Sequence, residues 1–571
     1  YMSLEKNYSI LDGSLLELPS DEKISFYSSI VSSDDCSFNE FSIPKIVIEF
    51  NDYVISYGIT INFVGNNLPE KMNVLFTSNG DKVLEHDYSP DEFKFYCSTD
   101  KKSITYNKVE ITFLETKFPN NVIKISNIDF GAKYSWQKED LISADLFEET
   151  DILSINLATD TLNFTVTSED DDFNILKQNG IYYALQKNQI VRAYEIIETY
   201  EDGTTDLISS ENVFLGNYYS REWKSGSKKE ITFKCIDLIG VLQDTKFDEG
   251  VFYTPDKYKL KDVIGEIMKV ADVTNYTVSD DIKDIGVYGF IPTMSCREAL
   301  HQVIFFIGAV ASCSRSNNLN IYLPSKKIKS TITDENHFDD DVVKLNPYIS
   351  KITVSENELE VSDNEQEIYK GYLDVGTHKI ETSSLMLVNG SSPYIAKDGT
   401  TGSGFIDDDY LALQYFVIRV TKAGNFVVKG KTQNIKAINV ITKDNTYQKN
   451  VLGKTISIDK NYFLARYIDG DKYVDHATPT IERILDYYNK RNECNCSFLL
   501  NDEVTGDWIY IRNQYGDITK ANILNMKIDL SGGFIANARL VCYENIEDLY
   551  YRYYASSDNT EIYTGETVGI I

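Results

Sequence analysis

The sequence predicts a mainly β protein of several domains: an N-terminal β-sandwich, two β-barrels, a small α/β insert and a C-terminal helix. The chain has 571 residues, which is too long for one hydrophobic core, since domains usually hold about 100–200 residues. Its 40 tyrosines and 28 phenylalanines favour half-buried strands. Apolar residues alternate with polar ones along most of the chain, and a helical period of apolar residues occurs in only three places. These three observations define the predicted fold class.

Residues 1–134 are predicted to form a polar extension followed by a β-sandwich. Six short runs of strand-forming residues are separated by turn formers such as Ser78-Asn79-Gly80. No segment with a helical period interrupts these runs, which favours antiparallel sheets. The expected strands are Ile46–Phe50, Ile59–Phe63, Asn73–Phe76, Phe93–Tyr96, Val109–Phe113 and Val122–Ile125.

Residues 135–250 are predicted to form the first barrel. It ends in a hairpin whose second strand carries Ile231, Phe233 and Cys235 on one face. The stretch Arg221–Lys229 has no apolar period and is expected to be a polar loop between the two strands. An Asp-Gly turn is expected between two earlier strands. The earlier strands and this turn are Ile152–Asn156, Thr161–Thr167, Gly180–Leu185, Ile190–Glu198 and, for the turn, Glu201–Asp206.

Two amphipathic helices indicate an α/β insert over residues 251–325. The first spans Lys259–Val273, with Leu260, Val263, Ile264, Ile267 and Met268 on one face. The second starts after Ser295, which has capping-box spacing to Glu298. His301 on this helix is expected to face solvent rather than to act as a base. A strand at Leu319–Leu323 closes the insert.

Residues 326–545 are predicted to form the second barrel, with a helix at 479–491 that is capped by Thr478 and has Pro479 in its first turn. Residues 546–571 form a tyrosine-rich tail. The tail is expected either to be disordered or to form a protein interface. The interface residues expected there are Tyr550, Tyr551, Arg552 and Tyr553.

No catalytic or cofactor-binding motif occurs in the sequence. There is no G-x-S-x-G, H-E-x-x-H, phosphate-binding loop or dinucleotide-binding glycine motif. The eight cysteines are scattered and are expected to be reduced; only Cys494 and Cys496 lie close together, without a second pair to complete a zinc site. The acidic runs lack EF-hand spacing and are expected to be solvated loops: Ser168–Asp172, Asp334–Asp341 and Ile406–Asp409. The sequence therefore predicts no catalytic residue, no cofactor and no metal.

The charge and hydropathy of the chain exclude two classes of partner. A net charge of −31 disfavours adhesion to nucleic-acid phosphates or to an anionic membrane, because both need basic patches. No run of the sequence approaches the ~18 apolar residues of a membrane span, so no membrane insertion is expected.

Three tyrosines of the predicted sandwich are candidates for sugar binding. Tyr53, Tyr57 and Tyr88 lie near expected strand ends, and aromatic rings in such places can stack on sugar faces. Alternatively, these tyrosines pack in the core or in a subunit interface.

The order of these domains resembles that of the tail-hub, or baseplate-hub, proteins of tailed phages and phage-tail-like bacteriocins of Gram-positive bacteria. Four segments carry most of this resemblance: "SADLFEETDILSINLATDTLNFTV", "ITFKCIDLIGVL", "GFIPTMSCREALHQVIFFIGAV" and "GDITKANILNMKIDLSGGFIANARL". The N-terminal "NKVEITFLETKFPNNVIKISNIDFG" looks like part of a discoidin-type or carbohydrate-binding jelly roll.

The resemblance implies two hub-type barrels in each subunit of a homotrimeric ring, without enzymatic activity. Such a ring joins the tail tube to the tail tip or spike of a virion assembled in the bacterial host cytoplasm. Its partners would be a distal tail or tube protein, a tape measure and a spike or fibre, with DNA only as passing cargo. Within it, Arg221, Trp223 and Lys224 are expected to meet a neighbouring subunit. The alternatives are a carbohydrate-binding adhesin that recognises host cell-wall glycan through the sandwich, and a wall hydrolase of an unrecognised type.

Overall fold

The computed structural model describes residues 26–545, apart from 40–41, 57, 65–66, 92–93, 99–103, 131–135, 137–139, 168–186, 201–206, 226–228, 339–340, 389–391, 446–453, 514 and 531–533. The fold is mainly β and multidomain, with 56% of the residues in strands and 9% in helices, which confirms the predicted fold class. The chain divides into two compact units. Unit 1 comprises Tyr1–Asp140 and Ser168–Leu185, and unit 2 comprises Leu141–Thr167 and Gln186–Ile571.

The described part of unit 1 is a β-sandwich of two four-stranded sheets. Side chains from both sheets, among them Ile61, Met72 and Tyr106, fill a single core. One sheet has the order β1 (Phe26–Tyr27), β8 (Lys124–Asp129), β3 (Gly58–Phe63), β6 (Lys94–Ser98); the other has the order β2 (Lys45–Ser56), β7 (Ile104–Thr116), β4 (Pro69–Ser78), β5 (Asp81–Tyr88).

The turn expected at Ser78-Asn79-Gly80 joins β4 to β5, and it uses the positive φ values of Asn79 (51°) and Gly80 (91°). The sequence analysis missed β5. This is an edge strand in which only Tyr88 is buried, so its residues show no apolar alternation.

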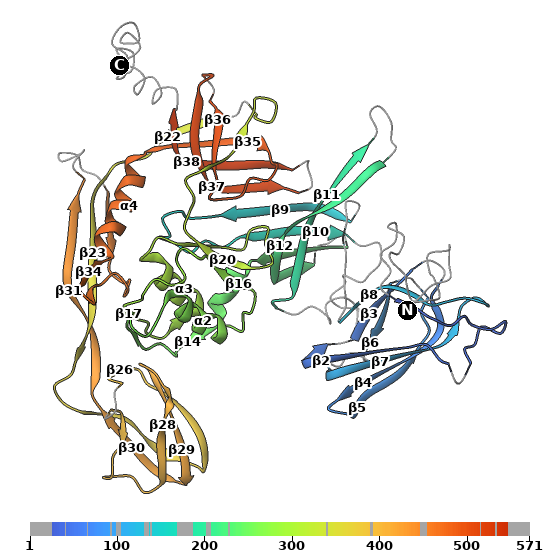
Figure 1. Ribbon diagram of the computed structural model, residues 1–571, viewed down its shortest axis with the longest axis horizontal. Coiled ribbons are helices and arrows are strands. Elements are labelled where there is room, and N and C mark those ends of the chain that lie inside the picture. The colour runs from blue at the N-terminus through green and yellow to red at the C-terminus, as the bar shows by residue number, and fades with distance from the viewer. Residues whose placement is uncertain are drawn as a thin grey trace. The chain divides into compact units, whose positions relative to one another are not determined.

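An eleven-stranded sheet organises unit 2 (Figure 1). Its strands are β9 (Leu141–Glu149), β10 (Thr161–Thr167), β11 (Ile190–Tyr200), β12 (Leu207–Ser225), β13 (Glu230–Ile236), β21 (Ile328–Ile332), β22 (Val342–Leu345), β35 (Asn492–Leu499), β36 (Trp508–Arg512), β37 (Ile518–Asp529) and β38 (Ile535–Asn545). The order is β11-β12-β13-β10-β9-β37-β38-β35-β22, with β36 paired to β37 and β21 paired to β36. Because β9 pairs with β37, strands predicted for two separate barrels share this sheet.

Two local expectations for the first barrel differ from the structure. Ile152–Asn156 is a turn rather than a strand, because the Asp151 carboxylate accepts hydrogen bonds from the backbone N–H groups of Leu153 and Asn156. The stretch after Ser220 continues β12 through Ser225 rather than forming a polar loop, and Trp223 lies opposite Phe233 on β13.

The α/β insert contains both predicted helices, α2 (Leu260–Val270) and α3 (Cys296–Phe305). All five predicted apolar residues of α2 are buried, and the capping box of Ser295 and Glu298 is present. His301 does not face solvent, because its Nε2 lies 2.7 Å from the backbone oxygen of Ser154. The remaining elements are α1 (Leu238–Val241), β14 (Lys246–Phe247), β15 (Phe252–Tyr253), β16 (Tyr276–Val278), β17 (Gly289–Phe290), β18 (Met294–Ser295), β19 (Val310–Ser312) and β20 (Leu319–Tyr322).

Residues 349–475 interrupt the eleven-stranded sheet with a long ribbon that carries a small β domain. The ribbon pairs β23 (Ile349–Val361) with β31 (Thr432–Asp444), and β26 (Leu385–Met386) and β32 (Lys454–Ile458) lie beside them. Phe416 and Phe426 lie in the core of the small domain. Its strands are β24 (Gln366–Leu373), β25 (Gly376–Glu381), β27 (Tyr394–Ile395), β28 (Ser403–Leu411), β29 (Tyr415–Lys422) and β30 (Gly424–Gly430).

The last helix, α4 (Ala477–Asn489), follows the hairpin of β33 (Arg466–Asp469) and β34 (Lys472–Asp475) and lies beside β23 (Figure 1). It begins two residues before the predicted start at Pro479. Thr478 is not its cap. Instead, the Asp475 carboxylate accepts hydrogen bonds from the backbone N–H groups of Ala477 and Thr478 and from the Thr478 hydroxyl.

Candidate functional site

The structure does not bring the predicted sugar-binding tyrosines together. The Tyr53 side chain on β2 is 56% exposed, and its hydroxyl accepts a hydrogen bond from Asn79 in the β4–β5 turn. Tyr88 ends β5 on the opposite edge of the same sheet, and it is buried against His86 and Phe95. Tyr57 lies outside the described residues. Of the two candidate tyrosines in the described part of the chain, Tyr53 offers an exposed ring and Tyr88 belongs to the core.

The three predicted interface residues of the hairpin differ in their hydrogen bonds and in their burial. Arg221 donates two hydrogen bonds to the Asp244 carboxylate and one to the side-chain oxygen of Asn188. These bonds hold the pKa of Asp244 below its usual value and fix Arg221 within its own chain. Trp223 is half-buried and Lys224 is exposed. The other predicted interface residues, Tyr550, Tyr551, Arg552 and Tyr553, lie outside the described residues.

Buried carboxyl groups gather where the eleven-stranded sheet meets the α/β insert. Glu148 on β9 is 0% exposed, and Nη2 of Arg315 lies 3.5 Å from its Oε2. Asp160, just before β10, accepts hydrogen bonds from the Ser314 hydroxyl and the Glu149 N–H. Asp237 caps α1 by accepting a hydrogen bond from the Gly240 N–H.

Burial raises the pKa of all three of these carboxyl groups: to about 8 for Glu148, to about 6 for Asp160 and well above the usual range for Asp237. Neither Glu148 oxygen has a hydrogen-bond partner among the described residues. A proton on Glu148 relieves the cost of burying its carboxyl group. The sequence analysis missed this cluster, since its members come from segments far apart in the chain.

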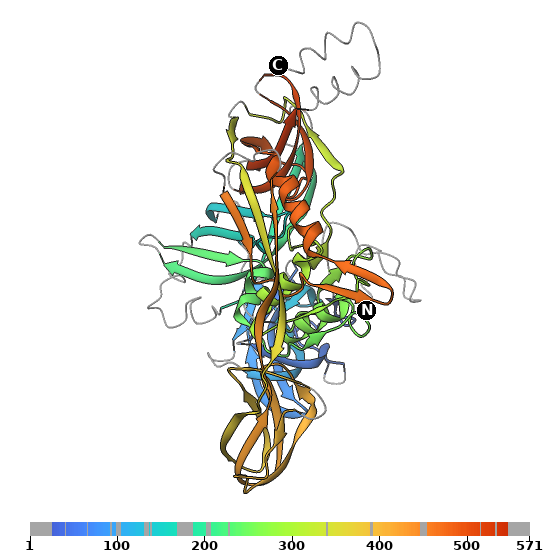
Figure 2. The ribbon, with the colours of Figure 1, turned by 90° about the vertical axis from the view of Figure 1, so that its left-hand side faces the viewer.

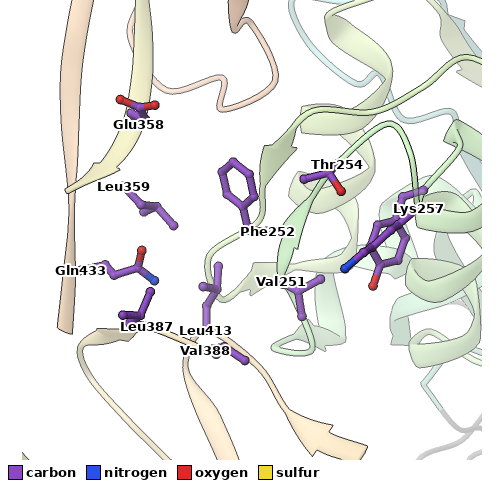
Figure 3. Close-up of a pocket in the computed structure, with 11 residues that line it drawn as sticks. Val251, Phe252, Thr254, Lys257, Glu358, Leu359, Leu387, Val388, Leu413 and Gln433 are labelled. Atoms are coloured by element: carbon purple, nitrogen blue, oxygen red, sulfur yellow. The ribbon is translucent and has the colours of Figure 1, made fainter. Parts of the chain in front are cut away.

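A cleft of about 470 Å³ opens between the α/β insert and the long ribbon (Figure 3). Phe252, Leu359 and Leu413 point into it, and Lys257 and Glu358 supply its charged groups. The other lining residues are Val251, Thr254, Tyr258, Leu387, Val388 and Gln433. The size suits a small ligand or an inserted side chain, and the lining is a mixture of polar and apolar groups. None of the sequence-predicted site residues lies in this cleft.

Two of the three outer strands of the eleven-stranded sheet, β11 and β22, expose apolar side chains. On β11, Ile190, Tyr194 and Ile196 are 55%, 51% and 47% exposed and share one face with the exposed Arg192, because all four are an even number of residues apart. On β22, Val342 and Leu345 are 60% and 61% exposed. The β11–β12 hairpin extends beyond β13, so its far half is a two-stranded ribbon (Figures 1 and 2). Exposed apolar rows of this kind are typical of interaction surfaces.

Two of the three acidic runs lie in the described part of the chain, and both differ from a fully solvated loop. Asp407 is buried and pairs with Arg419 on β29. His337 and Asp341 are also buried, and the structure places them beside Cys496 on β35. These three side chains could hold a metal, which the sequence analysis did not predict. The third run, Ser168–Asp172, lies outside the described residues.

All eight cysteines are described, seven of them are buried, and none forms a disulfide in this structure. Among the described residues, every helix is too short or too polar to cross a membrane.

No family model matches the chain, and no curated protein matches it. Three solved structures of tail proteins are similar to it, each with a TM-score of 0.38. A tail protein from Neisseria meningitidis MC58 is 10% identical, over 70% of this chain and 92% of that one. The prophage tail protein gp18 from Listeria monocytogenes EGD-e is 9% identical, over 73% and 91%. The 43 kDa tail protein of prophage MuSo2 from Shewanella oneidensis is 11% identical, over 73% and 97%. At this TM-score the likeness does not establish a common fold, so the function proposed below rests on the chain's own sequence and geometry.

Proposed function

We propose that this chain is a structural hub protein of a phage tail or tail-like particle, and that three copies form a ring between the tail tube and the tail tip. The resemblance of its segments to tail-hub proteins suggests this role. The structural observation that carries it is the pair of apolar outer strands, β11 and β22, on the same sheet.

A sheet with exposed apolar side chains on two of its outer strands can join to copies of itself. If β11 of one copy meets β22 of the next, the contact is head-to-tail, and a head-to-tail contact closes into a ring when the rotation between copies divides the circle evenly. In a trimer that rotation is one third of a turn. The backbone N–H and C=O groups on the open edges of β22 and β11 would also form hydrogen bonds with each other, because each strand has only one neighbouring strand among the described residues.

The remaining partners follow from this role. A distal tail or tube protein and a tape measure would contact one side of the ring, and a spike or fibre the other. In a phage, DNA would pass through the lumen only as cargo, and the net charge of −31 would keep its phosphates from adhering. Arg221 would act indirectly, by holding the base of the hairpin to Asp244, while Trp223 and Lys224 would lie at the subunit contact.

Light scattering of the purified full-length chain tests the assembly. The expected mass is three times 65.1 kDa, and negative-stain images should show rings. The double change Ile190→Lys and Ile196→Lys places charges in the apolar row of β11, so it should shift the mass to that of a monomer. The change Leu345→Lys on β22 should have the same effect, because it acts on the opposite side of the same contact.

A matched control is Ile468→Lys on β33. Ile468 is 74% exposed, so this change adds the same charge at an apolar surface residue away from the sheet edges, and the trimer should persist. The hub assignment would be contradicted by a wild-type chain that stays monomeric both alone and when mixed with its tube protein. It would also be contradicted by a trimer that survives the changes on both β11 and β22.

A second candidate function is that of a carbohydrate-binding adhesin acting through unit 1. The exposed ring of Tyr53 is the observation that favours it. Binding of wall or capsular glycans to a glycan array should then fall on Tyr53→Ala but not on Tyr372→Ala, which removes a 62% exposed tyrosine in unit 2. An array without any bound glycan would rule this function out and leave the hub function untouched.

A further inference from the structure

We infer that His337, Asp341 and Cys496 form a binding site for a transition-metal ion of the zinc type. Their ligand atoms all lie within 4.8 Å of one another. Cys496 lies on strand β35, His337 belongs to the segment that precedes β22, and Asp341 directly precedes β22. The inference does not depend on the proposed function.

Backbone pairing fixes this arrangement. The N–H of Phe338 donates to the backbone oxygen of Ser497, and the N–H of Leu499 donates to that of Asn336, so His337 lies opposite Phe498. Further along, Val342 pairs with Asn495. Continuing that register by one residue places Asp341 opposite Cys496. Residues 496 and 498 point to the same face of β35, so all three ligands converge on one side of the sheet.

The site is buried. The side chains of His337 and Asp341 are 8% and 3% exposed, and Cys496 is 4% exposed. His337 Nε2 lies 2.8 Å from the Asp341 carboxylate. A divalent cation would interact favourably with the carboxylate, the imidazole and the thiolate at the same time.

The donor set selects the metal. One imidazole nitrogen, one thiolate sulfur and one carboxylate oxygen suit Zn²⁺, which binds all three kinds of atom in tetrahedral sites. Ca²⁺ and Mg²⁺ prefer oxygen alone, which disfavours them here. Three protein ligands leave the fourth tetrahedral position for a water molecule or another donor.

The distances between the three ligand atoms need to change only a little to fit a tetrahedral zinc site. Bond lengths of about 2.0–2.3 Å at tetrahedral angles separate ligand atoms by about 3.3–3.6 Å. No two ligand atoms lie more than 4.8 Å apart, so no separation would have to shorten by more than about 1.5 Å, and the contact of 2.8 Å between His337 and Asp341 would open by about 0.5 Å. Side-chain torsions can supply both changes. The bound ion would link His337 and Asp341, which precede the outer strand β22, to Cys496 on β35.

The first experiment uses the full-length chain, stripped of metal with a chelator and then titrated with zinc or cobalt alone. We expect one equivalent of Zn²⁺ per chain by elemental analysis, and a near-ultraviolet sulfur-to-cobalt charge-transfer band with Co²⁺. Cys496→Ser should abolish the band, and His337→Gln should abolish the bound equivalent. Zinc should also raise the thermal midpoint of the wild type but not that of either variant.

Cys494→Ser is the matched control. Cys494 lies two residues away on the same strand and is 1% exposed, but it is not among the three clustered ligands. This variant should keep both the metal and the band. The inference would be overturned by a wild type that binds no zinc or cobalt, or by a band that survives Cys496→Ser and disappears with Cys494→Ser. If Cys496→Ser fails to fold, the stoichiometry of His337→Gln decides in the same way.

Discussion

Glu148→Gln should stabilise unit 2, and the gain in the free energy of unfolding should be larger at pH 7 than at pH 5. The Glu148 carboxyl is 0% exposed and burial raises its pKa to about 8, while its usual value is 4.5. Between these two values the folded chain therefore holds a proton that the unfolded chain has released. Stability rises with pH only where the unfolded state binds more protons, so this residue makes stability fall as the pH rises from 4.5 towards 8.

The size of the effect follows from the two pKa values. With 1.36 kcal/mol for each pH unit, the residue costs roughly 1 kcal/mol at pH 5 and roughly 3 kcal/mol at pH 7. Glutamine resembles the protonated side chain and does not titrate, so the variant should gain about 2–3 kcal/mol over the wild type between these two pH values. For a unit of roughly 400 residues this corresponds to about 3 °C in thermal midpoint.

Thermal unfolding at pH 5 and pH 7, followed by calorimetry, measures this difference. The control is Glu222→Gln on β12, which makes the same chemical change at an exposed residue paired with Lys234 at 3.5 Å; because an exposed ion pair contributes little, this variant should stay close to the wild type in thermal midpoint. If the difference between Glu148→Gln and the wild type is the same at both pH values, or is larger at pH 5, Glu148 is ionised in the folded chain and the reasoning fails.

Three further predictions concern unit 2. Leu300→Ala in α3 removes a 0% exposed side chain and should cost about 2–5 kcal/mol in thermal or denaturant unfolding, while Leu300→Met should cost less than about 1.5 kcal/mol; equal costs would contradict the packing argument. Ser295→Ala removes the capping box of α3 and should cost about 1 kcal/mol, with Ser295→Thr as the conservative control. Arg221 lowers the pKa of Asp244, so this pair stabilises the fold above the usual pKa of 3.8 and stops doing so as the pH falls below that value. In Asp244→Asn the free energy of unfolding, measured with urea, should therefore fall less between pH 7 and pH 3 than in the wild type. An equal fall in both proteins would contradict this prediction.

Local patterns predicted several elements of the fold closely. The bounds of β10, Thr161–Thr167, were predicted to the residue, because this strand has a clear alternation of apolar and polar residues. The stripe of α2 and the cap of α3 were also predicted, since each depends only on residues within one or two helical turns.

Long-range pairing explains most of what was missed. No local pattern indicates that β9 pairs with β37, so the continuity of the sheet could not be predicted. The same holds for the cluster at Cys496, whose partners come from a segment more than 150 residues away. Tyr88 was predicted as a candidate for sugar binding because it ends a strand, but whether a strand end faces the core depends on the second sheet of the sandwich.

The pairing of β9 with β37 also has a consequence for biosynthesis. A ribosome adds about 5–20 residues per second, so the edge of β9 waits roughly 20–70 s before the residues of β37 have been made. During that time the first five strands of the sheet can pair among themselves, but the side of β9 that later receives β37 remains open to other chains. Contacts between such distant residues also slow folding, because a long loop must close before they form. The nascent chain is therefore expected to need protection from aggregation, by chaperones or by slow expression at low temperature, until translation has passed Asp529.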